Sequence, residues 1–279
     1  MDRKNFKLAD SCNGLLLFEN TADLPAYDSG SPVEFTVYNP STRDFVDVPL
    51  PPTIYRHTFL LGLASLHDGN CFQVIRVCRG PASPTLHLDV FSSQTGEWHE
   101  KELVVGIRLP FLDDFRLFIG YSCTSVLFKG ALHWLFDKFL VIFHLEGEFV
   151  KLVELPPCVG RLHFPSYCIW ESEGCLNYRK CEEGEIWIWV LCMKGWEYDQ
   201  DENEFEWELK HRAMDSTKIP TSSSSSCSFQ PKAFNDDLDI VYLQCDESLF
   251  SYKLDTQVLQ ELSLDPFRRC SCCYKFIYV

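Results

Sequence analysis

The chain has 279 residues, of which 46% are hydrophobic and 14% aromatic, so it can bury a large core. Its formal net charge is −15 and it lacks a cluster of Lys and Arg, which argues against a protein that binds nucleic-acid phosphates. No uncharged apolar stretch reaches the ~18 residues of a membrane span. We therefore predict neither a nucleic acid nor a membrane as a partner.

The N-terminal residues carry no apolar run after Met1, so the sequence predicts no signal peptide. Fourteen cysteines are present, and most stand singly in apolar segments, as do Cys12, Cys71, Cys78, Cys123, Cys192 and Cys245. Without a secretory signal, this pattern is typical of reduced thiols that pack as small hydrophobes. We expect a cytoplasmic or nuclear protein, or one found in both places.

The first element that recurs along the chain is a hairpin, in which an apolar-aromatic strand is followed by a polar turn and an alternating strand. Copies lie at 34–45, 88–98, 141–149 and 249–257. The aromatic residues before their turns are Tyr38, Phe91, Phe143 and Tyr252, which lie 53, 52 and 109 residues apart. The last spacing predicts one more copy near residue 197, formed by Trp196, Tyr198 and 205–209 with a longer turn.

A second marker, a small turn followed by an apolar strand, precedes each hairpin and has the same period. Its turns contain Gly14, Gly69, Gly130, Gly184 and Asp237. Two markers with one period indicate five repeats of ~54 residues, and a repeat of about 50 residues with four strands has the size of a kelch-type propeller blade.

The turn residues have the chemistry that such hairpins need. Asn39 and Pro40 are preferred at the first and second positions of a turn. Gly96 and Gly147 are expected to supply the positive φ of tight hairpins. Two insertions interrupt the pattern, an acidic segment with seven carboxylates at 197–208 and a Ser-rich segment at 216–228 that includes Ser222 through Ser226.

Together these features predict an all-β fold, a kelch-like β-propeller that occupies 1–279 as a single domain. We count about five blades, although a sixth, degenerate blade is possible. The apolar segment 273–279 is the expected final strand that closes the ring, since propellers commonly pair strands from both termini.

Several motifs resemble a known family. Ser11-Cys12-Asn13-Gly14-Leu15-Leu16 with Val37-Tyr38-Asn39-Pro40-Ser41-Thr42 resembles the opening of the F-box-associated β-propeller domain of plant F-box proteins. Gly130 to Leu135, Glu173 to Leu176 and Ile186 to Leu191 are similar to its later motifs. The resemblance implies a propeller that recruits client proteins to a Skp-cullin ubiquitin ligase. Met1 to Asp10 is too short for an F-box, so contact with the Skp adaptor and cullin is expected only if an F-box is supplied.

Candidate catalytic and ligand sites are weak. The sequence has neither Gly-x-Ser-x-Gly nor Gly-x-Gly, which argues against a nucleophile elbow and phosphate-binding loops. His133 lies in an apolar strand and is interpreted as a core or strand-face residue. The metal candidates have poor spacing or lack a turn glycine: Cys168, Cys175 and Cys181 with His163; Cys270, Cys272 and Cys273; and the acidic run Asp199 to Glu204. We therefore predict no catalytic, cofactor-binding or metal-binding residues and no cofactor, and we leave the partner-binding residues unknown.

These observations favour a non-enzymatic, protein-binding propeller that acts as a substrate receptor of a ubiquitin ligase. One alternative is a stand-alone or decoy binding module without coupling to the ligase. A propeller hydrolase is less favoured, because it needs polar side chains that converge at one mouth of the channel. The insertions at 197–208 and 216–228 are interpreted as solvated loops rather than binding segments.

Overall fold

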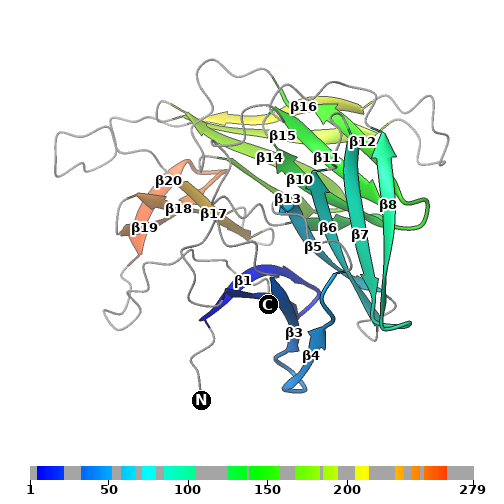
Figure 1. Ribbon diagram of the computed structural model, residues 1–279. Helices are drawn as coiled ribbons and strands as arrows, with labels where there is room; N and C mark the ends of the chain where they lie inside the picture. The colour runs from blue at the N-terminus through cyan, green and yellow to red at the C-terminus, as the bar shows by residue number, and fades with distance from the viewer. Residues whose placement is uncertain are drawn as a thin grey trace. The chain divides into compact units, whose positions relative to one another are not determined.

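The computed structural model describes thirteen stretches of the chain, and the statements below concern these residues (Figure 1). They are 5–21, 33–51, 58–66, 71–79, 85–104, 125–136, 138–156, 167–182, 185–193, 205–213, 230–235, 240–245 and 248–262. Their regular elements are all β-strands. In this part of the chain, no helix is long and apolar enough to cross a membrane.

The strands form five antiparallel sheets of four strands each, and in every sheet the strands lie in chain order. Blade 1 contains β1 (Asn5–Cys12), β2 (Leu15–Thr21), β3 (Glu34–Asn39) and β4 (Asp44–Val48). Blade 2 contains β5 (Thr58–Leu66), β6 (Cys71–Arg79), β7 (Thr85–Ser92) and β8 (Glu97–Val104). Blade 3 contains β9 (Val126–Phe128), β10 (Ala131–Phe136), β11 (Phe139–His144) and β12 (Phe149–Glu154).

The last two blades have the same order. Blade 4 contains β13 (Tyr167–Ser172), β14 (Cys175–Glu182), β15 (Glu185–Met193) and β16 (Phe205–Ala213). Blade 5 contains β17 (Gln230–Asn235), β18 (Ile240–Cys245), β19 (Ser248–Lys253) and β20 (Val258–Leu262). The five predicted blades are thus present, and the described residues form no sixth sheet.

Turn chemistry explains where the strands reverse. The first hairpins of blades 1, 3 and 4 turn through pairs in which both residues have positive φ: Asn13-Gly14, Lys129-Gly130 and Glu173-Gly174. Positive φ at both positions defines the turn whose twist matches two-residue hairpins. In each blade we call the turn between the third and fourth strands the outer turn. In blade 1, Asn39 begins this turn, and its side-chain oxygen accepts a hydrogen bond from the backbone N–H of Ser41 at 2.9 Å.

The outer turns of blades 1, 2, 3 and 5 each end with a residue of positive φ. Gly147 was predicted to be such a residue and is not. Arg43, Gly96, Glu148 and Gln257 have φ between 47° and 72°. Gly96 therefore has the predicted positive φ, whereas the prediction for Gly147 is wrong because the next residue, Glu148, adopts it. A Cβ atom at Gly147 would lie 2.7 Å from the ring of Phe149, so close approach explains the glycine there.

The repeat markers fall on equivalent strands with one exception. Tyr38, Phe91, Phe143 and Tyr252 all lie on the third strand of their blades. In blade 4 the second strand follows Gly174, so the assignment of Gly184 to this turn is wrong, since Gly184 precedes the third strand β15. The long connection from Met193 to Phe205 lengthens this blade and shifted the apparent period by one strand.

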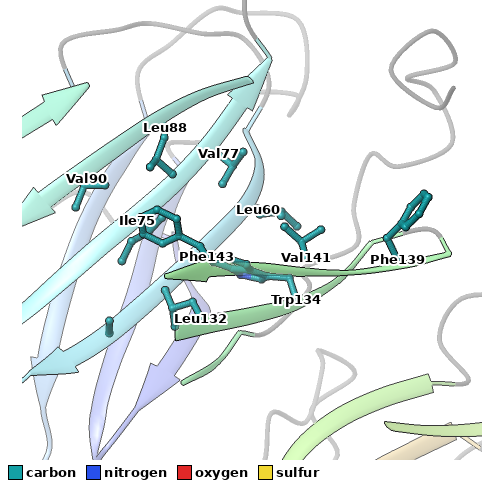
Figure 2. Close-up of a cluster of buried hydrophobic side chains, with 11 residues drawn as sticks. Leu60, Ile75, Val77, Leu88, Val90, Leu132, Trp134, Phe139, Val141 and Phe143 are labelled. Atoms are coloured by element: carbon teal, nitrogen blue, oxygen red, sulfur yellow. The ribbon is translucent and has the colours of Figure 1, made fainter. Parts of the chain in front are cut away.

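The chain divides into two compact units at a boundary between Leu152 and Val153, within β12. In the first unit, one apolar cluster joins blades 1 and 2 through Leu17, Val37, Leu63 and Val74. Another joins blades 2 and 3, where Ile75, Val77 and Leu88 lie across from Leu132, Trp134 and Phe143 (Figure 2). In the second unit, a cluster of Trp170, Ile188, Val241, Leu243, Phe250 and Tyr252 joins blades 4 and 5.

Some predictions lie outside the described residues. They concern the closing strand at 273–279, the aromatic residues Trp196 and Tyr198, the Ser-rich segment and most of the acidic segment. The single domain over 1–279 and the kelch-like character of the repeat stay predictions.

Candidate functional site

The histidine singled out in the sequence is a core residue. His133 lies on β10 with 1% of its surface exposed, and its Nδ1 lies 3.3 Å and 3.1 Å from the backbone oxygens of Val126 and Ala131. These distances fit a neutral ring that donates from Nδ1. Burial lowers the pKa of His133 to about 4. The neutral, enclosed ring supports the strand-face interpretation.

The mid-chain cysteines do not converge on a metal site. Cys168 pairs with Arg179 and Cys175 pairs with Ser172 in the β13–β14 hairpin, so four residue positions along the strands separate the two thiols. At a rise of about 3.3 Å per residue this is roughly 13 Å, well beyond the reach of one zinc ion. Cys181 lies on β14, whereas His163, Cys270, Cys272, Cys273 and Asp199 to Glu204 lie outside the described residues. Within the described ranges, no three metal-ligating side chains gather.

Charged side chains are buried in both units. In the first unit, Arg76 on β6 and Asp89 on β7 are directly opposite in the sheet, and Nη1 lies 3.4 Å from the carboxylate. Both side chains are almost fully enclosed. Nε of Arg76 also donates to the hydroxyl of Thr58 at 2.8 Å. Blade 2 thus neutralises its buried guanidinium with a carboxylate from the adjacent strand.

Asp10 is a buried carboxylate that connects three blades of the first unit. Its oxygens accept hydrogen bonds from the backbone N–H of Leu63 at 3.0 Å and of Ser125 at 3.2 Å. The hydroxyl of Ser125 donates a third, short bond at 2.5 Å. A register shift between Leu8 and Asp10 marks an irregularity of β1 at this point. Asp10 therefore joins β1 to β5 and to the residue before β9.

The second unit contains a buried guanidinium in a different setting. Arg179 on β14 is fully enclosed, and its cross-strand neighbours are Cys168 and Ile188. Nη2 donates to Sγ of Cys168 at 2.9 Å, and the guanidinium carbon lies 5.3 Å from the ring centroid of Trp170. Among the described residues, its Nε and Nη1 have no hydrogen-bond acceptor.

Within the described residues, these side chains form no catalytic arrangement. The buried thiols of Cys12 and Cys78 have pKa values raised by burial to about 11, so they stay protonated and are poor nucleophiles near neutral pH. Not all cysteines are buried as expected, since Cys175 is exposed and Cys71, Cys168 and Cys192 are partly exposed. The geometry supports blade packing rather than a nucleophile with an adjacent base.

The family model described as "F-box protein At3g26010-like, beta-propeller" matches residues 1–276. The chain belongs to this family of F-box protein propellers. The fold is therefore an all-β β-propeller of five blades, and the family points to a module of the protein-binding kind. Among curated proteins, none matches the sequence significantly.

The chain also has similarity to solved structures at low identity. One is the extracellular domain of the putative one-component system BT4673 from B. thetaiotaomicron, at 12% identity and a TM-score of 0.43, over 92% of this chain and 27% of that one. Another, in a Mitotic Checkpoint Complex structure, has 10% identity and a TM-score of 0.43, over 90% and 63%. A third, from work on two prolyl endopeptidases, has 14% identity and a TM-score of 0.41, over 89% and 33%. The chain spans less than two thirds of each of these chains.

In this F-box protein propeller, sequence reasoning missed the buried charges Asp10, Arg76, Asp89 and Arg179. A signal was present for one of them, because Arg76 interrupts the apolar run from Val74 to Cys78. A charged residue inside an apolar strand is almost never fully buried unless it is paired. Arg179 is also fully buried, so the same rule predicts a counter-ion for its guanidinium.

Proposed function

We propose that this chain is the client-recognition propeller of a substrate receptor of the Skp-cullin-F-box type, and that it binds a protein destined for ubiquitination. The observation that carries the proposal is the family match over residues 1–276. Fold alone does not establish function, since propellers host both enzymes and binding modules.

We further propose that the chain acts without catalysis. Two side chains with acid-base groups, His133 and Asp10, are enclosed and already hydrogen-bonded within the first unit. A general base must lie within hydrogen-bond reach of a substrate proton, which an enclosed side chain does not. This placement supports binding as the function.

Coupling to the ligase is a separate part of the proposal. Contact with the Skp adaptor and cullin requires an F-box, and the propeller by itself supplies client binding. A propeller that binds its client without such a contact is a stand-alone or decoy module. We place either form in the cytoplasm, the nucleus or both, where Skp-cullin ligases and their clients meet.

The test is affinity purification of the tagged chain from its native cells, followed by mass spectrometry, in two forms. One form is the chain itself, and the other carries an F-box fused to its N-terminus. We expect the same client proteins with both forms, and the Skp adaptor and cullin enriched with the fused form. A Gly62→Ala variant, whose blade packing is disturbed, serves as a control that should recover less client.

The outcomes separate the parts of the proposal. Clients with both forms and adaptor only with the fusion support recognition and the need for an F-box. Clients without adaptor in either form leave a stand-alone binding module and contradict the ligase role. No reproducible partner with either form, while both are folded by circular dichroism, contradicts protein recognition.

A further inference from the structure

The positively charged side chain of Arg179 lies at the apolar contact between blades 4 and 5. Its guanidinium lies beside Trp170, which belongs to the apolar cluster shared with Ile188, Val241 and Tyr252. An isolated ion loses several kcal/mol of hydration free energy when it is buried, and an arginine side chain stays charged in proteins. A buried guanidinium therefore needs an anion.

The chain itself offers a matched comparison in blade 2. Arg76, like Arg179, lies on the second strand of its blade and is buried, and the residue directly opposite on the third strand is Asp89. In blade 4 the residue opposite Arg179 on the third strand is Ile188, which has no charge. Blade 2 thus has a carboxylate opposite its buried arginine, whereas blade 4 has an uncharged side chain at the equivalent position.

The sulfur next to Arg179 does not replace the missing carboxylate. Cys168 accepts one bond from Nη2. Burial raises the pKa of the Cys168 thiol, so it remains neutral and contributes no counter-charge. Within the part of the chain that the structure describes, Nε and Nη1 remain donors without acceptors.

Two more polar groups lie buried at the same interface. Nε2 of His211 and the hydroxyl of Tyr252 form no hydrogen bond with any described residue, and the two rings lie 6.5 Å apart between centroids. His211 pairs with Ile188, which pairs with Arg179, so all three residues lie in one row across the sheet. At a strand spacing of about 4.8 Å, the Cα atoms of Arg179 and His211 are roughly 10 Å apart on one face.

We propose that Arg179 is the anchor of an anion-binding site in blade 4, which takes a small ligand carrying a phosphate or carboxylate group. Guanidinium donors form paired hydrogen bonds with the oxygens of either group. His211 on the same face of blade 4 and Tyr252 on blade 5 are further donors for a ligand that extends toward blade 5. Because Arg179 has no exposed surface, an anion reaches its guanidinium only when the surrounding side chains move apart. This site does not depend on client recruitment.

The test measures thermal unfolding of the full chain at constant ionic strength, with chloride replaced stepwise by inorganic phosphate or by acetate. A ligand that binds only the folded state raises the melting temperature in a saturable manner, by about 5 °C near a hundredfold excess over its Kd. We expect this rise for wild type with phosphate, acetate or both, and the two series identify the preferred group. Arg179→Met should lose it.

The matched control is Arg212→Met, which removes one positive charge from the same sheet. Arg212 is exposed and its guanidinium carbon lies 3.9 Å from the ring centroid of Trp187. Arg212→Met should keep the saturable rise. An equal response of wild type and Arg179→Met to both anions overturns the proposal, as does equal loss in Arg212→Met.

A direct readout covers the case in which Arg179→Met does not fold. In wild type labelled with 15N-arginine, the Nε–Hε signal of Arg179, assigned with Arg179→Lys, should shift saturably with the anion that stabilises the protein. A signal that stays in place while both anions are titrated overturns the anion site.

Discussion

Burial of the single residue His133 makes the stability of the first unit sensitive to acid. Its ring is enclosed in β10 and bonded to backbone carbonyls, and burial lowers its pKa from 6.5 to about 4. The unfolded chain therefore binds a proton more readily than the folded chain between these two values. Stability from this residue is complete above pH 6.5 and is lost as the pH falls toward 4.

We expect His133→Asn to reduce this loss. The pKa difference corresponds to at most about 3 kcal/mol between pH 6.5 and 4. The variant should be less stable than wild type at pH 7.5, because packing is lost, and the gap in unfolding free energy should shrink by roughly 1–3 kcal/mol at pH 4.5. Urea titrations at both pH values measure the gap.

Other groups titrate in this window and stay in both proteins. Burial also lowers the pKa values of His144 and His211, which are present in both proteins. His144 also lowers the pKa of His133 electrostatically, so the change in the gap includes this interaction. Only the change in the gap reports His133. A gap that is constant from pH 7.5 to 4.5 would show that His133 becomes protonated in the folded protein as easily as in the unfolded chain.

At the scale of elements, indole groups join strands that are far apart in sequence. Nε1 of Trp98 on β8 donates to the carbonyl of Pro49 after β4 at 2.7 Å, and Nε1 of Trp207 on β16 donates to the carbonyl of Glu154 at 3.0 Å. Trp134 on β10 donates to the carbonyl of Leu61 on β5 at 3.0 Å. Each bond pairs a buried or partly buried indole donor with a backbone carbonyl.

Trp134 lies against Gly62, and this pair can be tested by a double-mutant cycle. A Cβ atom at Gly62 would lie 2.6 Å from Cζ2 of Trp134, so Gly62→Ala should cost about 1–3 kcal/mol of unfolding free energy. Trp134→Phe should cost roughly 2–4 kcal/mol, because it leaves the Leu61 carbonyl without its donor and opens space. The space should relieve Gly62→Ala, giving a coupling energy of at least about 1 kcal/mol.

Gly14→Ala provides the control for backbone strain without crowding. Gly14 has φ of 80° and nothing within 4 Å of its missing Cβ, so its substitution should cost about 1 kcal/mol through conformation alone. In urea unfolding, the changes in unfolding free energy caused by Gly14→Ala and Trp134→Phe should then add in the double variant. Additivity for Gly62→Ala as well would contradict direct contact as the reason for the glycine.

Elements whose causes are local could be predicted from the sequence. The Asn13-Gly14 and Asn39-Pro40 turns are encoded by their own residues, and the third-strand aromatics gave the repeat. The error at Gly184 arose because a long connection in blade 4 disturbed the spacing. The buried charges could not be predicted, since Asp10 bonds to residues 53 and 115 positions away. Such partners depend on tertiary packing rather than on pattern.

At the scale of the whole molecule, the blades pack in sequence order within two compact units. In repeat architectures, stability is approximately a sum of repeat terms and nearest-neighbour interfaces, so a local defect need not spread through the chain. Asp10 is a suitable place for a defect, because it bonds to Leu63 and Ser125, which both lie in the first unit. Asp10→Asn replaces a charged acceptor of three bonds by an amide that cannot accept them all.

We expect Asp10→Asn to destabilise the first unit by roughly 2–4 kcal/mol and to leave the second unit intact. Hydrogen exchange followed by mass spectrometry should show faster exchange in peptides from Leu60–Leu66 and Ala131–His144, and wild-type rates from Ile240 to Leu262. Ser125→Ala, which removes only the hydroxyl bond, should accelerate the same peptides less. Equal acceleration of peptides up to Leu262 would mean that the two units open together, and the five blades would then form one cooperative unit.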